Sequence, residues 1–225
     1  MRKAILKNDL QYMKRDPMVW MSILTPFIFI VIYKVFVLRL DFFKPYQEVI
    51  QYIFIVMIPF LAGMVIGFRV LDEKDEHMIS FYAVSPLGIK GYVKLRMMMT
   101  AVLAAVGIIV MALFEVVPKE HLFFIGIQAV LLAPVVGLVV SVWGKNKIQG
   151  LTLVKIIGML SVLPVLKVIG ENPLDRIFVL IPSYNLFELI VASERNDWTL
   201  FYTGILGASI YLLMEYFNKK CIHEV

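Results

Sequence analysis

The sequence predicts an all-α membrane protein with six transmembrane helices, and its composition and charge pattern carry this prediction. Of the 225 residues, 60% are hydrophobic and 17% are charged, with a mean hydropathy of +0.84. An ordinary soluble domain is about 45 to 50% apolar and about 25% charged. The charged residues stand in the gaps between long apolar runs. Lipid offers no hydrogen-bond partner to the backbone, so each crossing run must be helical, and a soluble enzyme is excluded.

Six apolar runs are long enough to cross the hydrocarbon core, which takes about 20 helical residues. The predicted spans are 19–37, 50–68, 97–114, 122–143, 148–169 and 198–217. Residues 1–225 are therefore expected to form a single transmembrane domain.

A shorter apolar run follows the fifth span. It contains Glu188 and is interrupted at Pro182, so it is too short to cross the bilayer. We expect an interfacial or re-entrant break within an outer segment, 170–197. Asn185 and Glu188 have the spacing of a capping box, which predicts a short helix that starts around Leu186.

The distribution of basic residues predicts the orientation. Of the 22 Lys and Arg residues, 14 fall in segments on the side of the two termini and five in the loops on the other side. The positive-inside rule then places both termini in the cytoplasm, in a multi-pass protein of the plasma membrane. The net charge of +5 comes from these flanking residues. It needs no nucleic-acid partner to explain it.

The N-terminal segment combines apolar and basic positions. The apolar side chains that fall at helical spacing are Ile5, Leu6, Leu10 and Met13. Residues 1–17 are therefore predicted to form an amphipathic interfacial helix, which closes with Arg15, Asp16 and Pro17 before the chain enters the bilayer. The alternative is a basic tail that serves only the positive-inside rule.

The sizeable loop on the side of the termini is 69–90, between the second and third spans. Its charged run is followed by an apolar stretch with two aromatic residues. We expect a short helix from about Asp72 to Val84, with Ser85 as the N-cap and Pro86 as the first residue of the next helix. Exposed apolar patches rimmed by charge usually mark contact sites, so this helix is expected to dock against a partner. The alternative is a helix that lies on the membrane surface without a partner.

No motif or cluster supports chemistry within the chain itself. Cys221 is the sole cysteine, and the histidines, His77, His121 and His223, fall in three separate segments. Phosphate-loop, lipase and zinc-protease motifs are absent from the sequence. We therefore expect no catalytic residue, no cofactor and no metal in this chain, which makes it a transport subunit rather than an enzyme.

Three lysines lie within the predicted spans. Lys34 and Lys167 stand within a turn of the outer ends and are expected to extend towards the membrane surface. Lys155 lies deeper, so it is a candidate for pairing with a neighbouring helix or for lining a substrate path.

Several motifs give the chain a resemblance to a known family. They are Arg15-Asp16-Pro17 before a first span with Pro26, Ser85-Pro86-Leu87 after the charged loop, and Pro182-Ser183-Tyr184 after the fifth span. In these, and in its layout, the chain resembles the membrane subunits of type-2 ABC exporters (ABC-2 permeases). Those proteins have six spans, an inner surface helix, a coupling helix between the second and third spans, and a broken outer segment. The family often has Glu-Gly-Thr where this chain has Glu76-His77-Met78, a departure that points to a distinct ATPase partner.

The resemblance implies a machine of two kinds of subunit. A separate ABC ATPase subunit would bind ATP and Mg, and would also bind the loop helix. Phe81 and Tyr82 would be apolar anchors, and Glu73 and Glu76 rim charges. The full set of coupling residues that the resemblance implies is Glu73, Glu76, His77, Met78, Phe81 and Tyr82.

The resemblance also implies a second permease copy or a related permease, because one copy has only six spans. Short external loops suggest export of an amphipathic or hydrophobic substrate, such as a drug, an antibiotic peptide or a lipid. The alternative is a secondary transporter or a small integral membrane enzyme that acts without an ATPase. Carriers of that kind usually have acids in mid-span or an inverted repeat, and the sequence has neither feature.

Overall fold

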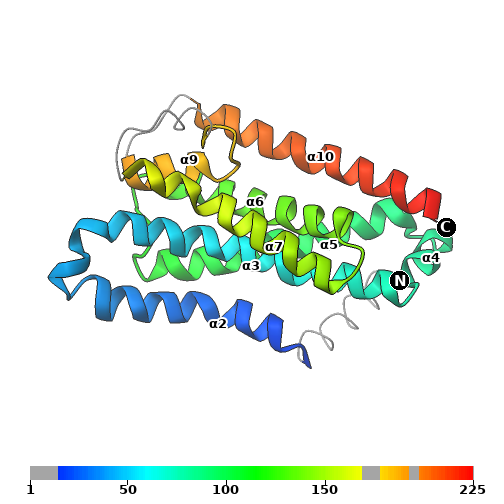
Figure 1. Cartoon of the computed structure of the whole chain (residues 1–225), viewed down its shortest axis with the longest axis horizontal. Helices are drawn as coiled ribbons and strands as arrows, with labels where there is room; N and C mark the ends of the chain where they lie inside the picture. The colour runs from blue at the N-terminus through cyan, green and yellow to red at the C-terminus, as the bar shows by residue number, and fades with distance from the viewer. Residues whose placement is uncertain (1–14, 169–177, 193–197, 225) are drawn as a thin grey trace.

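The computed structural model describes residues 15–168, 178–192 and 198–224, and the regular structure in this part of the chain is helical (Figure 1). The elements in chain order are α2 (Pro17–Ile32), η1 (Tyr33–Val37), η2 (Asp41–Tyr46), α3 (Gln47–Asp75), α4 (Met78–Val84), α5 (Gly88–Leu113), α6 (Leu122–Trp143), α7 (Lys147–Val162), η3 (Leu163–Val168), α9 (Tyr184–Phe187), η4 (Glu188–Ala192) and α10 (Thr199–Glu224).

Six helical stretches among the described residues are long and apolar enough to cross a membrane. They are Pro17–Val37, Asp41–Asp75, Gly88–Leu113, Leu122–Trp143, Lys147–Val168 and Thr199–Cys221. They run alternately up and down one bundle (Figure 1), which confirms the predicted fold class. We call the end that carries α4 and the last turn of α10 the terminal end, and the opposite end, with η2 and α9, the loop end. Which end faces the cytoplasm stays a prediction.

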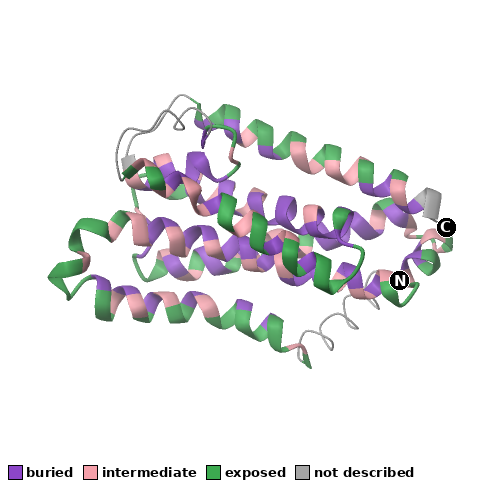
Figure 2. Ribbon diagram, in the orientation of Figure 1, coloured by how far each residue is buried: buried purple, intermediate pink, exposed green. Residues whose placement is uncertain are grey.

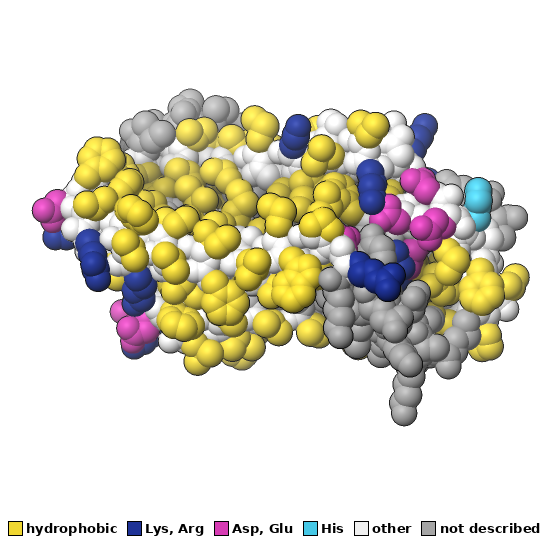
Figure 3. Space-filling view, turned by 90° about the horizontal axis from the view of Figure 1, so that it is seen from below, with side chains coloured by type: hydrophobic (Ala, Val, Ile, Leu, Met, Phe, Trp, Pro, Cys, Tyr) yellow, Lys and Arg dark blue, Asp and Glu magenta, His cyan; other side chains and the backbone are white. Residues whose placement is uncertain are grey.

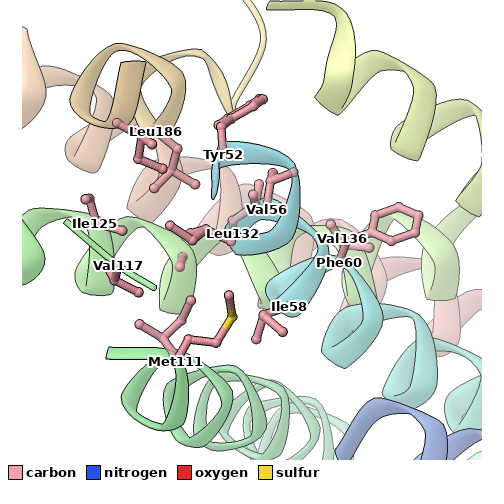
Figure 4. Packing of buried hydrophobic residues seen from close by; sticks show 14 of the residues in the cluster. Tyr52, Val56, Ile58, Phe60, Met111, Val117, Ile125, Leu132, Val136 and Leu186 are labelled. Atoms are coloured by element: carbon pink, nitrogen blue, oxygen red, sulfur yellow. The ribbon is translucent and has the colours of Figure 1, made fainter. Parts of the chain in front are cut away.

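The centre of the bundle is the contact between α3 and α6, the two spans that are most deeply buried. A Cβ atom at Gly63 of α3 would lie 2.6 Å from the Ala133 carbonyl oxygen of α6. Only a residue without a side chain allows the two backbones to come this close. Around this contact, buried apolar side chains of α3, α5, α6 and α9 interdigitate, as Figure 4 shows for Tyr52, Met111 and Leu186.

The spans at the periphery present apolar side chains outwards. Much of α2, α7 and α10 is exposed (Figure 2). On the face drawn in Figure 3, hydrophobic side chains dominate the middle, and most charged side chains lie towards the two ends. This is the surface that a lipid bilayer covers, because lipid solvates apolar side chains and the headgroup regions solvate charged ones.

Local sequence explains where two of the spans begin. Asp16 caps α2: its Oδ1 accepts a hydrogen bond from the Met18 amide at 2.8 Å, and Pro17 takes the first helical position. Asn146 caps α7 in the same way, through the Gln149 amide at 3.0 Å. Both caps satisfy amides that have no partner within the helix.

The segment before the last span folds back into the bundle at the loop end. Its short helix begins at Tyr184, so the expected start around Leu186 and the capping box of Asn185 were wrong. Asn185 lies buried inside the helix. The Ser183 hydroxyl instead donates to the carbonyl of Ser161 on α7, at 2.9 Å. The remainder of the predicted outer segment, 170–177 and 193–197, lies outside the described residues.

Two lysines of the spans have carboxylate neighbours at the loop end. Lys167 Nζ lies 2.6 Å from Glu188 Oε1 and 3.1 Å from the Tyr184 hydroxyl, which ties η3 to the folded-back segment. Lys34 Nζ lies 3.9 Å from Glu115 Oε2, and both of these side chains are partly exposed. Lys167 is therefore held by an ion pair rather than simply extended to the surface.

Candidate functional site

The chain turns twice at the terminal end, between the second and third spans. α3 ends at Asp75, and His77 takes a left-handed backbone conformation, with φ of 57°, before α4 begins at Met78. α4 ends at Val84, and Gly88, with φ of 65°, starts α5. The short helix α4 thus sits across the end of the bundle (Figure 1).

These turns correct two details of the sequence prediction. The expected continuous helix from Asp72 to Val84 is interrupted at His77, because a left-handed residue cannot continue an α-helix. Ser85 does not cap α5. Its hydroxyl donates to the Tyr82 carbonyl at 2.8 Å and accepts from the Leu87 amide at 3.3 Å, so it closes the turn after α4.

α4 has an inner and an outer face. Ile79 and Tyr82, three residues apart, are buried against the bundle. Phe81 and Val84, also three residues apart, are exposed, and Phe81 has 57% of its surface accessible. A helix of seven residues therefore presents apolar side chains both to the bundle and away from it.

A buried carboxylate lies just beneath α4. Glu73 of α3 forms an ion pair with Arg96 of α5, and each side chain is only 1% exposed. Arg96 Nε donates to Glu73 Oε2 at 3.2 Å, and Arg69 Nε lies 3.3 Å from Glu73 Oε1. The Tyr92 hydroxyl donates to Oε2 as well. We call these four residues the buried ion cluster. Such a cluster persists only when every charge is paired, because burying an unpaired carboxylate costs several kcal/mol.

The cluster connects α4 to two spans. The Tyr82 ring of α4 stacks on the Tyr92 ring of α5, with centroids 4.7 Å apart and an interplanar angle of 18°. The guanidinium of Arg96 lies 5.3 Å from the centroid of the Tyr92 ring. Through Glu73 the same contacts reach α3. The stack therefore joins α4 to α5, and the hydrogen bond from Tyr92 to Glu73 extends the connection to α3.

The structure divides the predicted coupling residues into two groups. Glu76, His77 and Phe81 are exposed at or near α4, and Met78 is half-buried. Glu73 and Tyr82 are buried, so their predicted exposure as a rim charge and an apolar anchor was wrong. The role of all six residues in coupling stays a prediction.

Sequence reasoning missed three members of the buried ion cluster. They are Arg69, Tyr92 and Arg96. Arg69 and Glu73 are spaced i and i+4, which places both side chains on one face of a helix, and that spacing was the available signal. No comparable signal links Glu73 to Arg96, which lies 23 residues further along the chain.

The interfacial helix predicted for 1–17 falls largely on residues 1–14, outside the described residues. Of its closing motif, Arg15 is exposed, while Asp16 and Pro17 form the start of α2. Pro17 is well placed at the first helical position, where its missing N–H would have no partner in any case.

Lys155 lies on the exposed face of α7, in an apolar groove of about 660 Å³ between α3 and α7. Met57 and Phe60 of α3 and Gly158 and Met159 of α7 line the groove beside it. Within the described residues, Lys155 has no ion-pair partner on a neighbouring helix. Over the same residues, no group of three or more His, Cys, Asp or Glu side chains is placed to hold a metal ion.

Comparison with known proteins relates this arrangement to transport. Residues 9–217 match the family described as Rv2686c-like, the fluoroquinolones export permease protein Rv2686c-like. Two similar proteins come from Mycobacterium tuberculosis: the fluoroquinolones export permease protein MT2760 of strain CDC 1551 / Oshkosh, and Rv2686c of strain ATCC 25618 / H37Rv. Each is 25% identical over 226 residues, which covers 93% of this chain and 88% of the relative. No solved structure matches the chain.

Proposed function

Because the chain belongs to the Rv2686c-like fluoroquinolone export permease family, we propose that it is the membrane subunit of an ATP-driven exporter of the ABC-2 type. The family match, which extends from before the first span into the sixth, is the observation that carries this proposal. Its substrate is an amphipathic or hydrophobic molecule, with drugs of the fluoroquinolone class as the first candidates, since the similar proteins are named for their export.

In this proposal a separate ATPase subunit binds ATP and Mg and docks on α4. The exposed face of α4 supports this, because Phe81 and Val84 form an apolar surface beside the exposed side chains of Glu76 and His77. A displacement of α4 would be transmitted through the Tyr82–Tyr92 stack to the buried ion cluster, and from there to α3 and α5.

The exporter contains two permeases, either two copies of this chain or one copy and a related chain. The largely exposed apolar surfaces of α2 and α7 are available for such a contact. Lys155 is the candidate residue of the substrate path. Lys155 lines an apolar groove, where its ammonium would attract an acidic group on an otherwise apolar molecule.

The function is tested by drug accumulation in a bacterial host that lacks its main efflux pumps. The chain is expressed with its candidate ATPase, and the intracellular fluorescence of norfloxacin is measured. We expect accumulation to fall only when both subunits are present and to recover when the phosphate-loop lysine of the ATPase is replaced. The purified chain alone should neither bind nor hydrolyse ATP. Export by the chain alone, abolished by a protonophore, would instead establish the secondary transporter.

The proposed orientation, with both termini in the cytoplasm, is tested by thiol labelling of whole cells. Native Cys221 is buried and would be protected on either side, so it is first replaced by Ser. Cysteine is then introduced at the exposed positions Lys44, at the loop end, or Lys145, at the terminal end. We expect an impermeant maleimide to label K44C in intact cells and K145C only after permeabilisation. The reverse pattern would invert the orientation.

A further inference from the structure

A hollow of about 250 Å³ opens at the terminal end, where α3, α4, α10 and the turn between α6 and α7 meet. Three lysines from three different parts of the chain line it: Lys74, Lys145 and Lys220. His77 stands at its edge, and Asp75 is the carboxylate among its lining residues. Basic side chains that are far apart in the sequence thus converge on one small polar space.

Two of these lysines are fixed by the end of α6. Lys74 Nζ donates to the Ser141 carbonyl at 2.6 Å, and Lys220 Nζ donates to the Val142 carbonyl at 2.7 Å. The last carbonyls of a helix have no partner within it and attract cations. Capping explains why Lys74 and Lys220 lie here, but it does not explain Lys145. Lys145 lines the same hollow, and among the described residues neither Lys145 nor Lys220 is in an ion pair.

Two aromatic side chains beside the hollow indicate that it lies at the depth of the lipid headgroups. Trp143 of α6 and Tyr216 of α10 are exposed and stack on each other, with ring centroids 6.2 Å apart. Trp and Tyr side chains gather at the interface between hydrocarbon and water. Trp143 immediately precedes the lining residue Gly144, and Tyr216 lies one helical turn before Lys220. The lysines are therefore just beyond the aromatic side chains, at the level of the phosphates.

We propose that this hollow binds a phosphate group, carried by the headgroup of an anionic phospholipid. Two ammonium groups held in place by α6 and a third on the adjacent turn form a preorganised anion site, and basic pockets between spans are known to hold acidic headgroups. A soluble phosphate offers the same chemistry, but the exposed Trp143–Tyr216 pair favours the lipid as its source. The proposal depends neither on the substrate of the exporter nor on the orientation of the chain.

The test measures how strongly the full chain binds phosphatidylglycerol. The chain is reconstituted in phosphatidylcholine nanodiscs with Trp20 and Trp198 replaced by Phe, so that Trp143 reports alone. Brominated phosphatidylglycerol is then titrated, and the quenching of Trp143 fluorescence is followed. We expect saturable quenching at a low fraction of phosphatidylglycerol, beyond that given by brominated phosphatidylcholine.

The variants are chosen to separate the hollow from general surface charge. K145S and K220Q should each weaken phosphatidylglycerol binding about tenfold or more, the effect of losing one hydrogen bond to a charged group. K219S is the matched control, because Lys219 is an exposed neighbour of Lys220 that does not line the hollow. K145S keeps the test valid even where K220Q unfolds, since Lys145 donates to the Gln149 side chain through its backbone amide, which the substitution retains.

Each outcome decides the proposal. Loss of binding in K145S but not in K219S supports it. Displacement of phosphatidylglycerol by millimolar inorganic phosphate, also lost in K145S, supports the phosphate site but makes a soluble phosphate its ligand. Equal losses in K145S and K219S overturn it, because lipid binding is then only a matter of net charge. Unchanged lipid binding together with lost association of the ATPase in K145S also overturns it, and assigns the hollow to an acidic segment of that subunit.

Discussion

Removing Glu73 should destabilise the bundle more than removing Arg96, although the two form one ion pair. In E73L the guanidinium of Arg96, 1% exposed, loses its carboxylate and stays buried. In R96L the carboxylate of Glu73 keeps Arg69 at 3.3 Å and the hydroxyl of Tyr92. The asymmetry follows because two arginines share one carboxylate, so that the carboxylate is the member without a substitute.

The magnitudes follow from the burial of the pair. Breaking a buried ion pair by removing one member costs about 3–5 kcal/mol, because the other charge is left uncompensated. We expect this cost for E73L. For R96L we expect about 1.5–3 kcal/mol, the range for a lost hydrogen bond to a charged group whose other partners remain. The double variant E73L/R96L should be more stable than E73L alone, with a coupling free energy of about 0.5–3 kcal/mol.

The free energy of unfolding is measured in mixed micelles of dodecyl maltoside and SDS, by the loss of helical circular dichroism. The matched control is K90M, which breaks the ion pair between Lys90 and Glu215 at the same end of the bundle. That pair is largely exposed at Lys90, so its loss should cost less than about 1 kcal/mol. If E73L is no more destabilised than K90M, or if R96L is worse than E73L, the carboxylate is not the centre of the cluster.

Five further substitutions test other parts of the bundle. F81A should weaken association with the ATPase about 30-fold in a pull-down assay, as for an interface anchor worth about 2 kcal/mol. Y82A should leave the outer face of α4 intact but lower the free energy of unfolding by about 3 kcal/mol. G63A should cost about 1–3 kcal/mol of stability, because the added Cβ meets a carbonyl of α6 at 2.6 Å, while G126A, with open space around it, should be neutral in the same unfolding assay. K155M should impair export of substrates that carry a carboxylate, measured by their accumulation in cells.

The spans could be predicted because the bilayer imposes them. The fourth predicted span, 122–143, coincides with α6, and hydropathy alone located all six. The ends of the helices were less well predicted, because a helix can continue beyond the hydrocarbon core of the bilayer. α3 continues beyond the predicted 50–68 as far as Asp75. Its last turns are stabilised by contacts such as the ion pair between Asp72 and Lys147 of α7, at 2.8 Å. Hydropathy carries no information about such contacts.

The buried ion cluster could not be predicted, because its members are local in structure and distant in sequence. Glu73 stands among five consecutive charged residues, a pattern typical of a solvated surface. The helix nevertheless places Glu73 on the face of Ile66 and Val70, which are buried. Extending the apolar periodicity of α3 into the charged run would have shown that Glu73 falls on the buried face of the helix. The identity of the partner, Arg96, still requires the packing of α5 against α3.

The side of α4 that faces a partner was also beyond the sequence prediction. Phe81 and Tyr82 are adjacent aromatic residues, and the composition of the loop does not distinguish between them. On a helix, adjacent residues point about 100° apart, so both cannot lie on one face. The spacing of Ile79 and Tyr82 does place those two together, and the structure buries both. The anchor available to another subunit is therefore Phe81, with Val84 beside it.

Lys155 differs from the other two lysines of the spans in its pairing with carboxylates. Lys167 and Lys34 have carboxylates within 2.6 and 3.9 Å, whereas no described acid pairs with Lys155. A charge within the apolar span is costly, so an acidic group beyond the described residues, or the membrane surface, must stabilise it. If the group belongs to a substrate, K155M should weaken export of a carboxylate drug about 10- to 100-fold, from about 1.5–3 kcal/mol for a hydrogen bond to a charged group. K155R should restore export, and the methyl ester of the drug should not distinguish K155M from the parent. Equal export of acid and ester by all three proteins would show that Lys155 only reaches the membrane surface.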